Sequence, residues 1–256
     1  MALFIDGPPS NIEDLTNQDS GLVDVCRVEQ IDASRKLKLA HEELGVELEA
    51  LFDQQRCLYF YFNDRPQLDL RHLAVTPLLK MWHTWHTLSL IYRDAYFSQL
   101  NDRFQAKWNE FRALGQSAKS WLRDLGVGLV LNPLPRPRGP ILTAIPESEA
   151  NGTFYLAVAL VNQAGEESAP SPTVSIELSG GNAAGVQLAP EHTNACGWNV
   201  YAGATPTTLC LQNSESVAIS DSWLFYPSTA VVNGRGPGKG QNPNFVRALP
   251  RLLQRG

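Results

Sequence analysis

The sequence predicts an α+β protein of two domains, an α-helical bundle followed by a β-sandwich, with an extended C-terminal tail. Apolar residues recur every three or four positions in the first half of the chain and every second position later on. A proline-rich stretch separates the two patterns, and the charge changes with it. At 256 residues the chain is long enough for each half to bury its own core.

Three helices are expected in the first half. The box Ser10–Glu13 predicts a helix start, because the Ser hydroxyl and the Glu carboxylate can each bind a free backbone N–H, and one helix is expected over 15–29. Asp32 is a candidate N-cap for a second helix over 33–53. Thr76-Pro77 begins the third, since Thr caps helices and Pro suits the first helical position.

The third helix is expected to be the long one. Aromatic and apolar residues recur at steps of three and four from Leu78 to Phe111. This stripe predicts a helix that reaches at least Leu114, with a break near Gly115 and a continuation to Leu125.

The proline-rich stretch and the alternating pattern define the remaining segments. Four prolines in 132–140 force an extended backbone, so this stretch is expected to be a semi-rigid linker between a helical domain, 1–131, and a β domain, 141–231. The tail is the remaining segment, 232–256. Strands are expected at Phe154–Val161, Thr173–Leu178, Trp198–Tyr201 and Thr208–Leu211. Short strands at such spacing predict a β-sandwich.

Charge is distributed unevenly along the chain. Residues 139–231 contain no Lys or Arg, whereas no acidic residue follows Asp221. The formal net charge of −5 does not indicate a nucleic-acid-binding protein. The four cysteines lie far apart without a C-x-x-C pair, which fits neither a zinc site nor a disulfide scaffold. We expect no signal peptide and no membrane span, and therefore a protein made in the cytoplasm.

No catalytic, cofactor or metal site is predicted, and the protein is not expected to be an enzyme. His83 and His86 could share a helix face as metal ligands, but no third His or carboxylate lies within the next turn. A solvated or interface surface is favoured over an acid/base pair for the acidic residues Glu42, Glu43, Glu47 and Glu49. The glycine-rich stretch 234–240 follows no clear strand and precedes no helix, so it is not a phosphate loop.

Several stretches of the chain carry a resemblance to virion proteins. In the helical half there are two. The first comprises Asp19–Val25, Glu29–Asp32 and Leu37–Leu48, and the second comprises Tyr92–Tyr96 and Gln99–Trp108. They resemble the head–tail connector (adaptor) proteins that tailed bacteriophages and gene transfer agents place beneath the portal. The β half is similar to immunoglobulin/fibronectin-like modules of virion proteins through Gly165–Ser171 and Gly197–Tyr201. Compact members of the connector family lack such a module.

The resemblance implies a structural protein of the virion neck, assembled in the host cytoplasm. It implies a homo-oligomeric ring of twelve copies between the portal protein and the tail or neck proteins, with DNA passing through the lumen without sequence-specific binding. The alternative is a virion-decorating module that binds a host surface or carbohydrate. In that case the side chains that stack on sugars would be Trp198, Tyr201, Trp223 and Tyr226.

Two groups of residues are candidates for protein–protein interfaces. Arg93-Asp94 and Asp102-Arg103 are nine residues apart, about 13 Å along one helix, so they are expected to pair with another helix or subunit rather than with each other. The other interpretation is that they are solvated. The tail has an amphipathic pattern that is expected to bind the portal, or the acidic β-sandwich of a neighbouring copy. Its candidate residues are Arg247, Leu249, Arg251, Leu252, Leu253 and Arg255.

Overall fold

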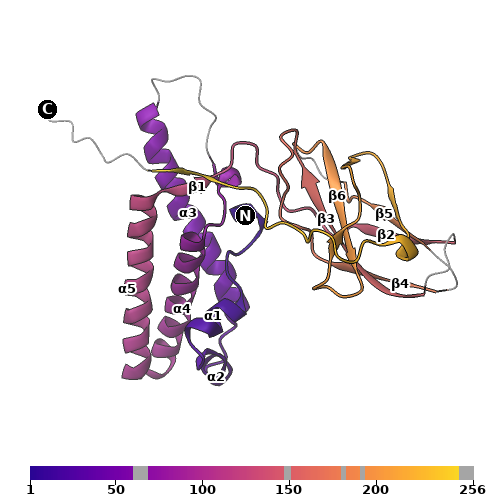
Figure 1. Cartoon of the computed structure of the whole chain (residues 1–256). Coiled ribbons are helices and arrows are strands. Elements are labelled where there is room, and N and C mark those ends of the chain that lie inside the picture. The colour runs from indigo at the N-terminus through magenta and orange to yellow at the C-terminus, as the bar shows by residue number, and fades with distance from the viewer. Residues whose placement is uncertain (60–68, 147–150, 180–182, 191–193, 248–256) are drawn as a thin grey trace. The chain divides into compact units, whose positions relative to one another are not determined.

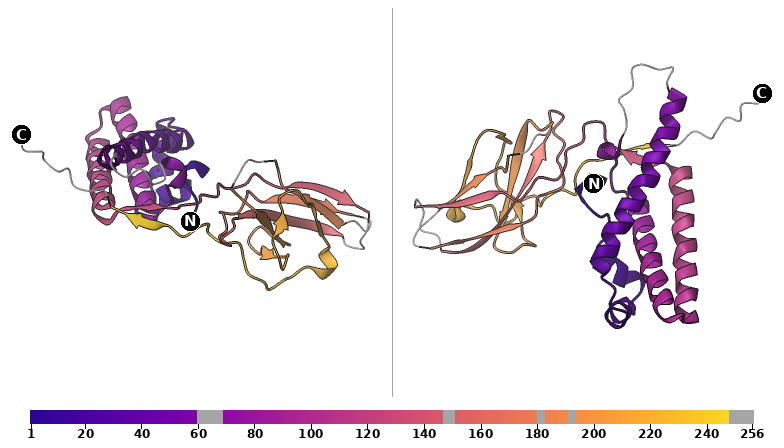
Figure 2. Two further views of the ribbon diagram at one scale, coloured as in Figure 1. Left: turned by 90° about the horizontal axis from the view of Figure 1, so that it is seen from above. Right: turned by 180° about the vertical axis from the view of Figure 1, so that it is seen from behind.

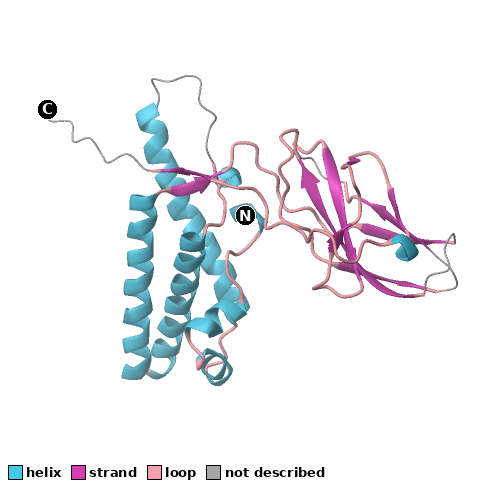
Figure 3. Cartoon of the chain, in the orientation of Figure 1, coloured by secondary structure: helices cyan, strands magenta, loops and turns pink. Residues whose placement is uncertain are grey.

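The structure, a computed structural model, describes residues 1–59, 69–146, 151–179, 183–190 and 194–247 (Figure 1). The chain divides into two compact units. The helical unit contains Gly7–Leu129 and the chain from Pro243 onward, and the β unit contains Met1–Asp6 and Val130–Asn242. The α-helices of the described residues all belong to the helical unit, and the strands belong to the β unit apart from one small sheet in the helical unit (Figure 3). The β unit also contains two 3-10 turns, Phe4–Asp6 and Pro227–Thr229. The chain therefore passes from one unit to the other three times.

Five α-helices build the described part of the helical unit. They are α1 (Ile12–Gln18), α2 (Leu22–Val28), α3 (Ala33–Tyr59), α4 (Pro77–Gln99) and α5 (Asp102–Leu125), with the 3-10 turn η2 (Leu70–His72) before α4. Helix α4 packs against both α3 and α5, and all three run alongside one another (Figures 1 and 2). The predicted starts of α3 and α4 are confirmed: Asp32 accepts the N–H groups of Ser34 and Arg35, and Thr76 accepts that of Leu79.

The start of the first helix differs from the prediction. Its capping box is formed by Asn11 and Asp14, whose side chains each accept the other's backbone N–H at 2.9 Å. Ser10 is instead buried, with its hydroxyl 2.6 Å from Nδ1 of His83. A tertiary hydrogen bond has thus taken the hydroxyl that the sequence pattern assigned to the cap.

The predicted helix over 15–29 is two helices. Helix α1 ends at Gln18, and α2 begins at Leu22. Between them, the carboxylate of Asp19 accepts the N–H of Gly21 at 3.0 Å. This local side-chain bond stabilises a turn in place of a continuous helix.

The long helix is also two helices, and its predicted break near Gly115 is wrong. The chain turns at Leu100, which has a left-handed backbone with φ of 52°, and Asn101 then caps α5 by accepting the N–H of Arg103 at 3.0 Å. Helix α5 continues through Gly115 to Leu125.

The aromatic stripe forms the contact between the two arms of this hairpin. Tyr92 stacks on Phe111 with ring centroids 5.7 Å apart, and Tyr96 stacks on Trp108 at 6.0 Å. The period of three and four continues through the turn because each arm buries the same kind of face against the other. Periodicity therefore predicted the helices but not the point where the chain folds back.

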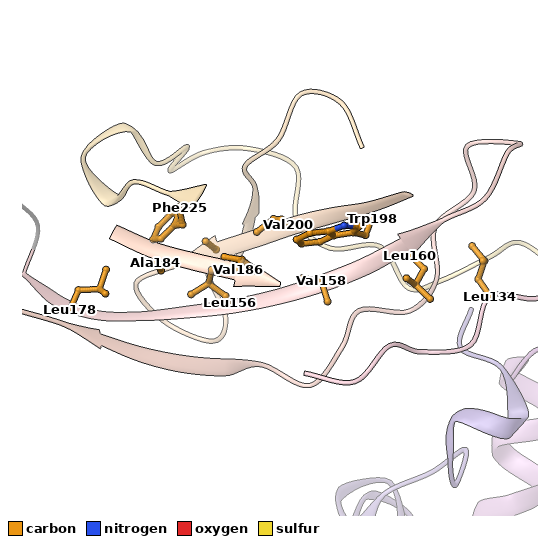
Figure 4. Packing of buried hydrophobic residues seen from close by; sticks show 11 residues of the cluster. Leu134, Leu156, Val158, Leu160, Leu178, Ala184, Val186, Trp198, Val200 and Phe225 are labelled. Atoms are coloured by element: carbon orange, nitrogen blue, oxygen red, sulfur yellow. The ribbon is translucent and has the colours of Figure 1, made fainter. Parts of the chain in front are cut away.

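The β unit contains two antiparallel sheets, with strand orders β2-β5-β9 and β4-β3-β6-β7, and β8 also pairs with β6. The strands are β2 (Ile141–Ile145), β3 (Gly152–Val161), β4 (Val174–Leu178), β5 (Ala183–Gln187), β6 (Gly197–Gly203), β7 (Cys210–Leu211), β8 (Val217–Ala218) and β9 (Trp223–Phe225). One hydrophobic cluster draws on both sheets, with Val158 and Trp198 from one and Val186 and Phe225 from the other (Figure 4). Strands β3, β4, β6 and β7 fall at the predicted stretches.

The stretch predicted as a linker lies within the β unit. Leu134 is buried in the cluster of Figure 4, and the guanidinium of Arg136 donates to the carbonyl of Pro170 at 2.6 Å. The prolines keep this segment extended, but its leucine and its backbone pack on the unit rather than holding it at a distance.

The first part of the predicted tail is also folded. Arg235 donates two hydrogen bonds to Glu167, at 3.0 and 2.6 Å. Gln241 is buried; its amide donates to the carbonyl of Asn132 at 2.9 Å and its oxygen accepts the N–H of Leu134 at 2.7 Å. The chain then forms β10 (Asn244–Val246), which pairs antiparallel with β1 (Val127–Leu129) in the helical unit.

Candidate functional site: a polar cluster and a groove in the helical unit

A buried carboxylate joins the turn after α1 to α4 and α5. The side chain of Asp19 is only 6% exposed. One of its oxygens accepts the hydroxyl of Tyr92 at 2.5 Å and an ammonium hydrogen of Lys107, and the other accepts the N–H of Gly21. Three donors, from the turn after α1, from α4 and from α5, therefore bind one carboxylate.

The electrostatics of this cluster keep it in one protonation state. Burial on its own would raise the pKa of Asp19, but the hydrogen bonds from Lys107, Tyr92 and Gly21 outweigh it and the pKa lies below its ordinary value. Burial, together with the neighbouring carboxylate, raises the pKa of the Tyr92 phenol. An ionised Asp that accepts three hydrogen bonds beside a protonated Tyr is suited to holding elements together, not to proton transfer.

A groove of about 420 Å³ lies among α3, α4 and α5. Its apolar lining comprises Trp82, Leu90, Trp108 and Phe111. Both of its acids are paired: Glu43 lies 2.6 Å from Nε2 of His86, and Glu47 forms an ion pair with Lys119.

Two arginines in the groove are not matched in this way. Nε of Arg93 lies 3.6 Å from Asp94, but the other oxygen of that carboxylate is bound by Lys36 of α3. Arg112 makes no hydrogen bond or ion pair with any described residue. The groove thus has an excess of positive charge over an apolar lining.

The predicted interface residues of the helical half do not lie on one helix, so the separation of about 13 Å along a single axis is wrong. Arg93 and Asp94 belong to α4, whereas Asp102 and Arg103 open α5 beyond the turn. Asp94 has the expected partner on another helix, Lys36. Asp102 is exposed, and Arg103 is exposed beside a cavity of about 250 Å³ next to Tyr92.

Of the predicted tail residues, the structure describes only Arg247. It is exposed and directly follows β10. The other candidates lie outside the described residues: Leu249, Arg251, Leu252, Leu253 and Arg255.

The two histidines considered as metal ligands have separate protein partners. His83 is fully buried, with Nε2 3.0 Å from the carbonyl of Leu37 and Nδ1 next to Ser10, and burial lowers its pKa to about 4. His86 is bonded to Glu43. Within the described ranges, no three His, Cys, Asp or Glu side chains come together as a metal site.

The aromatic residues considered for sugar binding are mostly part of the core. Trp198 and Tyr201 are completely buried, so they are unavailable for stacking. The hydroxyl of Tyr201 donates to Glu167, and Trp223 packs against the hydrophobic cluster. The expected aromatic platform is therefore not formed by these strands.

Sequence reasoning missed the pairing of Asp19 with Tyr92 and Lys107, and it also missed Arg112. Asp19 is separated from its two partners by 73 and 88 residues, and no local spacing encodes such contacts. The only signal was that all three lie in the stretches that resemble connector proteins.

A comparison with models of known protein families finds no match for this chain, and a search of curated proteins finds none either. Among the helices of the described residues, none has both the length and the apolar character required to cross a membrane.

Proposed function

We propose that this protein is a structural head–tail connector that forms a ring between the portal and the tail of a phage-like particle. The observation that carries the proposal is the cluster around Asp19. The two stretches that resemble connector proteins are far apart in sequence, yet Asp19 of the first binds Tyr92 and Lys107 of the second. Asp19, Tyr92 and Lys107 lie in the connector-like stretches and also contact one another. We therefore expect them to stabilise the arrangement of helices that this chain would have in common with connector proteins.

The helical unit also has surface features that favour assembly. Apolar side chains are exposed on α2, at Val23 and Val28, and at the hairpin turn, where Phe97 is 63% and Leu100 68% exposed. The two places adjoin, since the hydroxyl of Ser98 donates to Glu29 (Figure 1). Clustered apolar exposure is typical of protein–protein contact surfaces.

The β unit is, in this proposal, an immunoglobulin-like sandwich and a second domain carried on the outside of the neck. Its support is the pair of antiparallel sheets that share the cluster containing Trp198 and Phe225. We do not propose carbohydrate binding, because two of the four aromatic residues considered for it are buried in the core.

The proposed partners are the portal protein on one side and tail or neck proteins on the other. The number of copies in the ring, twelve, is taken from the resemblance to connector proteins alone. DNA would pass through the lumen without sequence-specific contact, and assembly would take place in the host cytoplasm.

Co-sedimentation of the full chain with DNA-filled, tailless heads tests this function. We expect the chain to sediment with heads that contain a portal and not with portal-free shells of the same capsid. Equal binding to both kinds of shell would identify a capsid-decorating protein, and binding to neither would contradict the connector function.

A further inference from the structure

The groove among α3, α4 and α5 contains two guanidinium groups, those of Arg93 and Arg112, that could bind carboxylates of a partner. Its acids, Glu43 and Glu47, are already bound by His86 and Lys119. Arg112 has no acidic partner within the described residues, and Arg93 shares Asp94 with Lys36. A complementary segment would therefore bring carboxylates to the arginines and an apolar side chain to the aromatic lining.

The β unit has the opposite surplus of charge. It carries nine acidic against four basic side chains, and none of the basic ones lies within 139–231. The exposed acids Glu215 and Asp221 have no cationic partner in the part of the chain that the structure describes; the carboxylate of Asp221 accepts a hydroxyl hydrogen bond from Ser220.

These two acids flank an exposed apolar residue. Ile219 lies between them and is 38% exposed, just after the short strand β8. The N–H of Asp221 donates to the carbonyl of Ala218 at 3.0 Å, which folds this part of the segment into a tight turn. Segment 215–221 thus presents one apolar side chain and two carboxylates on a short, ordered piece of chain.

We propose that the groove of one copy binds segment 215–221 of a second copy of this chain. Ile219 packs on the aromatic lining, and the carboxylates of Glu215 and Asp221 bind the guanidinium groups of Arg93 and Arg112. The inference rests on the proposed function and deepens it by naming the contact between neighbouring subunits. Because groove and segment are different surfaces of the same chain, the contact is heterologous, and its repetition gives a ring when the rotation from one copy to the next closes.

Sedimentation velocity of the purified full chain over a range of concentrations tests this contact. The wild type is expected to self-associate, and Arg93→Glu with Arg112→Glu is expected to weaken association by about tenfold or more, as is Glu215→Arg with Asp221→Arg. The variant that carries all four changes restores the charge match and is expected to recover association. Arg35→Glu with Arg123→Glu is the control, since it makes the same change of net charge at exposed sites outside the groove. Circular dichroism checks that each variant is folded.

Three results overturn the inference. They are a wild type that stays monomeric at every concentration, a groove variant that associates as well as the control, and a failure of the fourfold variant to recover. None of these bears on binding to portal-containing heads, so the contact and the connector function fail separately. Co-sedimentation with both kinds of shell, or with neither, contradicts the connector function but does not change the result expected from sedimentation velocity.

Discussion

At the scale of single residues, Asp19 is the side chain that joins three elements of the helical unit. Its three donors come from the turn after α1, from α4 and from α5, so the carboxylate holds the two connector-like stretches together. A buried charge that loses a partner is costly, because the remaining group is left desolvated without compensation.

Asp19→Asn is therefore expected to lower the free energy of unfolding by about 1–3 kcal/mol at neutral pH. The pKa of Asp19 is lowered by folding, so its stabilisation is complete above the ordinary carboxyl value and is lost as the pH falls through the folded-state pKa. The gap between wild type and variant should thus be full at neutral pH and shrink below about pH 4. Urea unfolding followed by circular dichroism at several pH values measures it.

The matched control is Asp24→Asn. Asp24 forms an exposed pair with Arg27 on α2, and such pairs contribute about 0–1 kcal/mol. A pH-independent gap for Asp19→Asn, or an equal effect of the two variants, would contradict the role assigned to the buried cluster.

Two glycines of the helical unit should respond to alanine in opposite directions. A Cβ on Gly115 would come no closer than 3.9 Å to its nearest neighbour, so Gly115→Ala is expected to stabilise α5 by about 0.5–1 kcal/mol. Gly126 has φ of 99°, and its Cβ would lie 2.8 Å from the carbonyl oxygen of Val246. Gly126→Ala is expected to destabilise the unit by about 1–3 kcal/mol. Thermal unfolding of both variants measures whether each substitution raises or lowers the stability. A change in the same direction for both would be inconsistent with the packing of β10 against Gly126.

At the scale of elements, the sequence predicted those whose signals are local. The caps of α3 and α4 and the alternating strands β3, β4 and β6 lie where short patterns placed them. Strands β1, β2, β5, β8, β9 and β10 were not predicted, because each has only two to five residues and shows no clear alternation of apolar and polar side chains. The hairpin turn at Leu100 has no Gly or Pro, so the aromatic stripe concealed it.

The candidate site could be predicted from the sequence only in part, because its contacts join residues that are far apart in the chain. Arg93, Asp94, Asp102 and Arg103 were identified as charges in need of partners, and the sequence cannot state that Lys36 binds Asp94 from another helix. The groove is a property of three packed helices, so no linear pattern marks Arg112. Contacts between residues that are far apart in the chain cannot be predicted from local sequence patterns.

The folded part of the tail leads to a prediction about two truncations. A chain that ends at Arg247 retains Gln241 and β10, and its stability should equal that of the full protein. A chain that ends at Gly240 loses the three hydrogen bonds of the Gln241 side chain, to Asn132, Leu134 and Glu166, and should be less stable by about 2–4 kcal/mol. Calorimetry distinguishes the two.

Equal stability of both truncated chains would mean that the segment after residue 240 does not belong to the fold. The shorter deletion, of residues 248–256, also separates a role in partner binding from a role in folding. Loss of binding to portal-containing heads by the chain that ends at Arg247, with its stability unchanged, would assign the portal contact to the end of the tail.

At the scale of the whole molecule, the central claim is that the chain forms a ring at the neck of a phage-like particle. An electron cryomicroscopy reconstruction of particles that contain this protein, with the symmetry determined locally at the neck, tests it most directly. The account predicts a ring of twelve helical units directly beneath the portal, with a β unit from each copy at its outer surface. Density for the chain on the capsid shell or the tail fibres, with a neck built from other proteins, would contradict it.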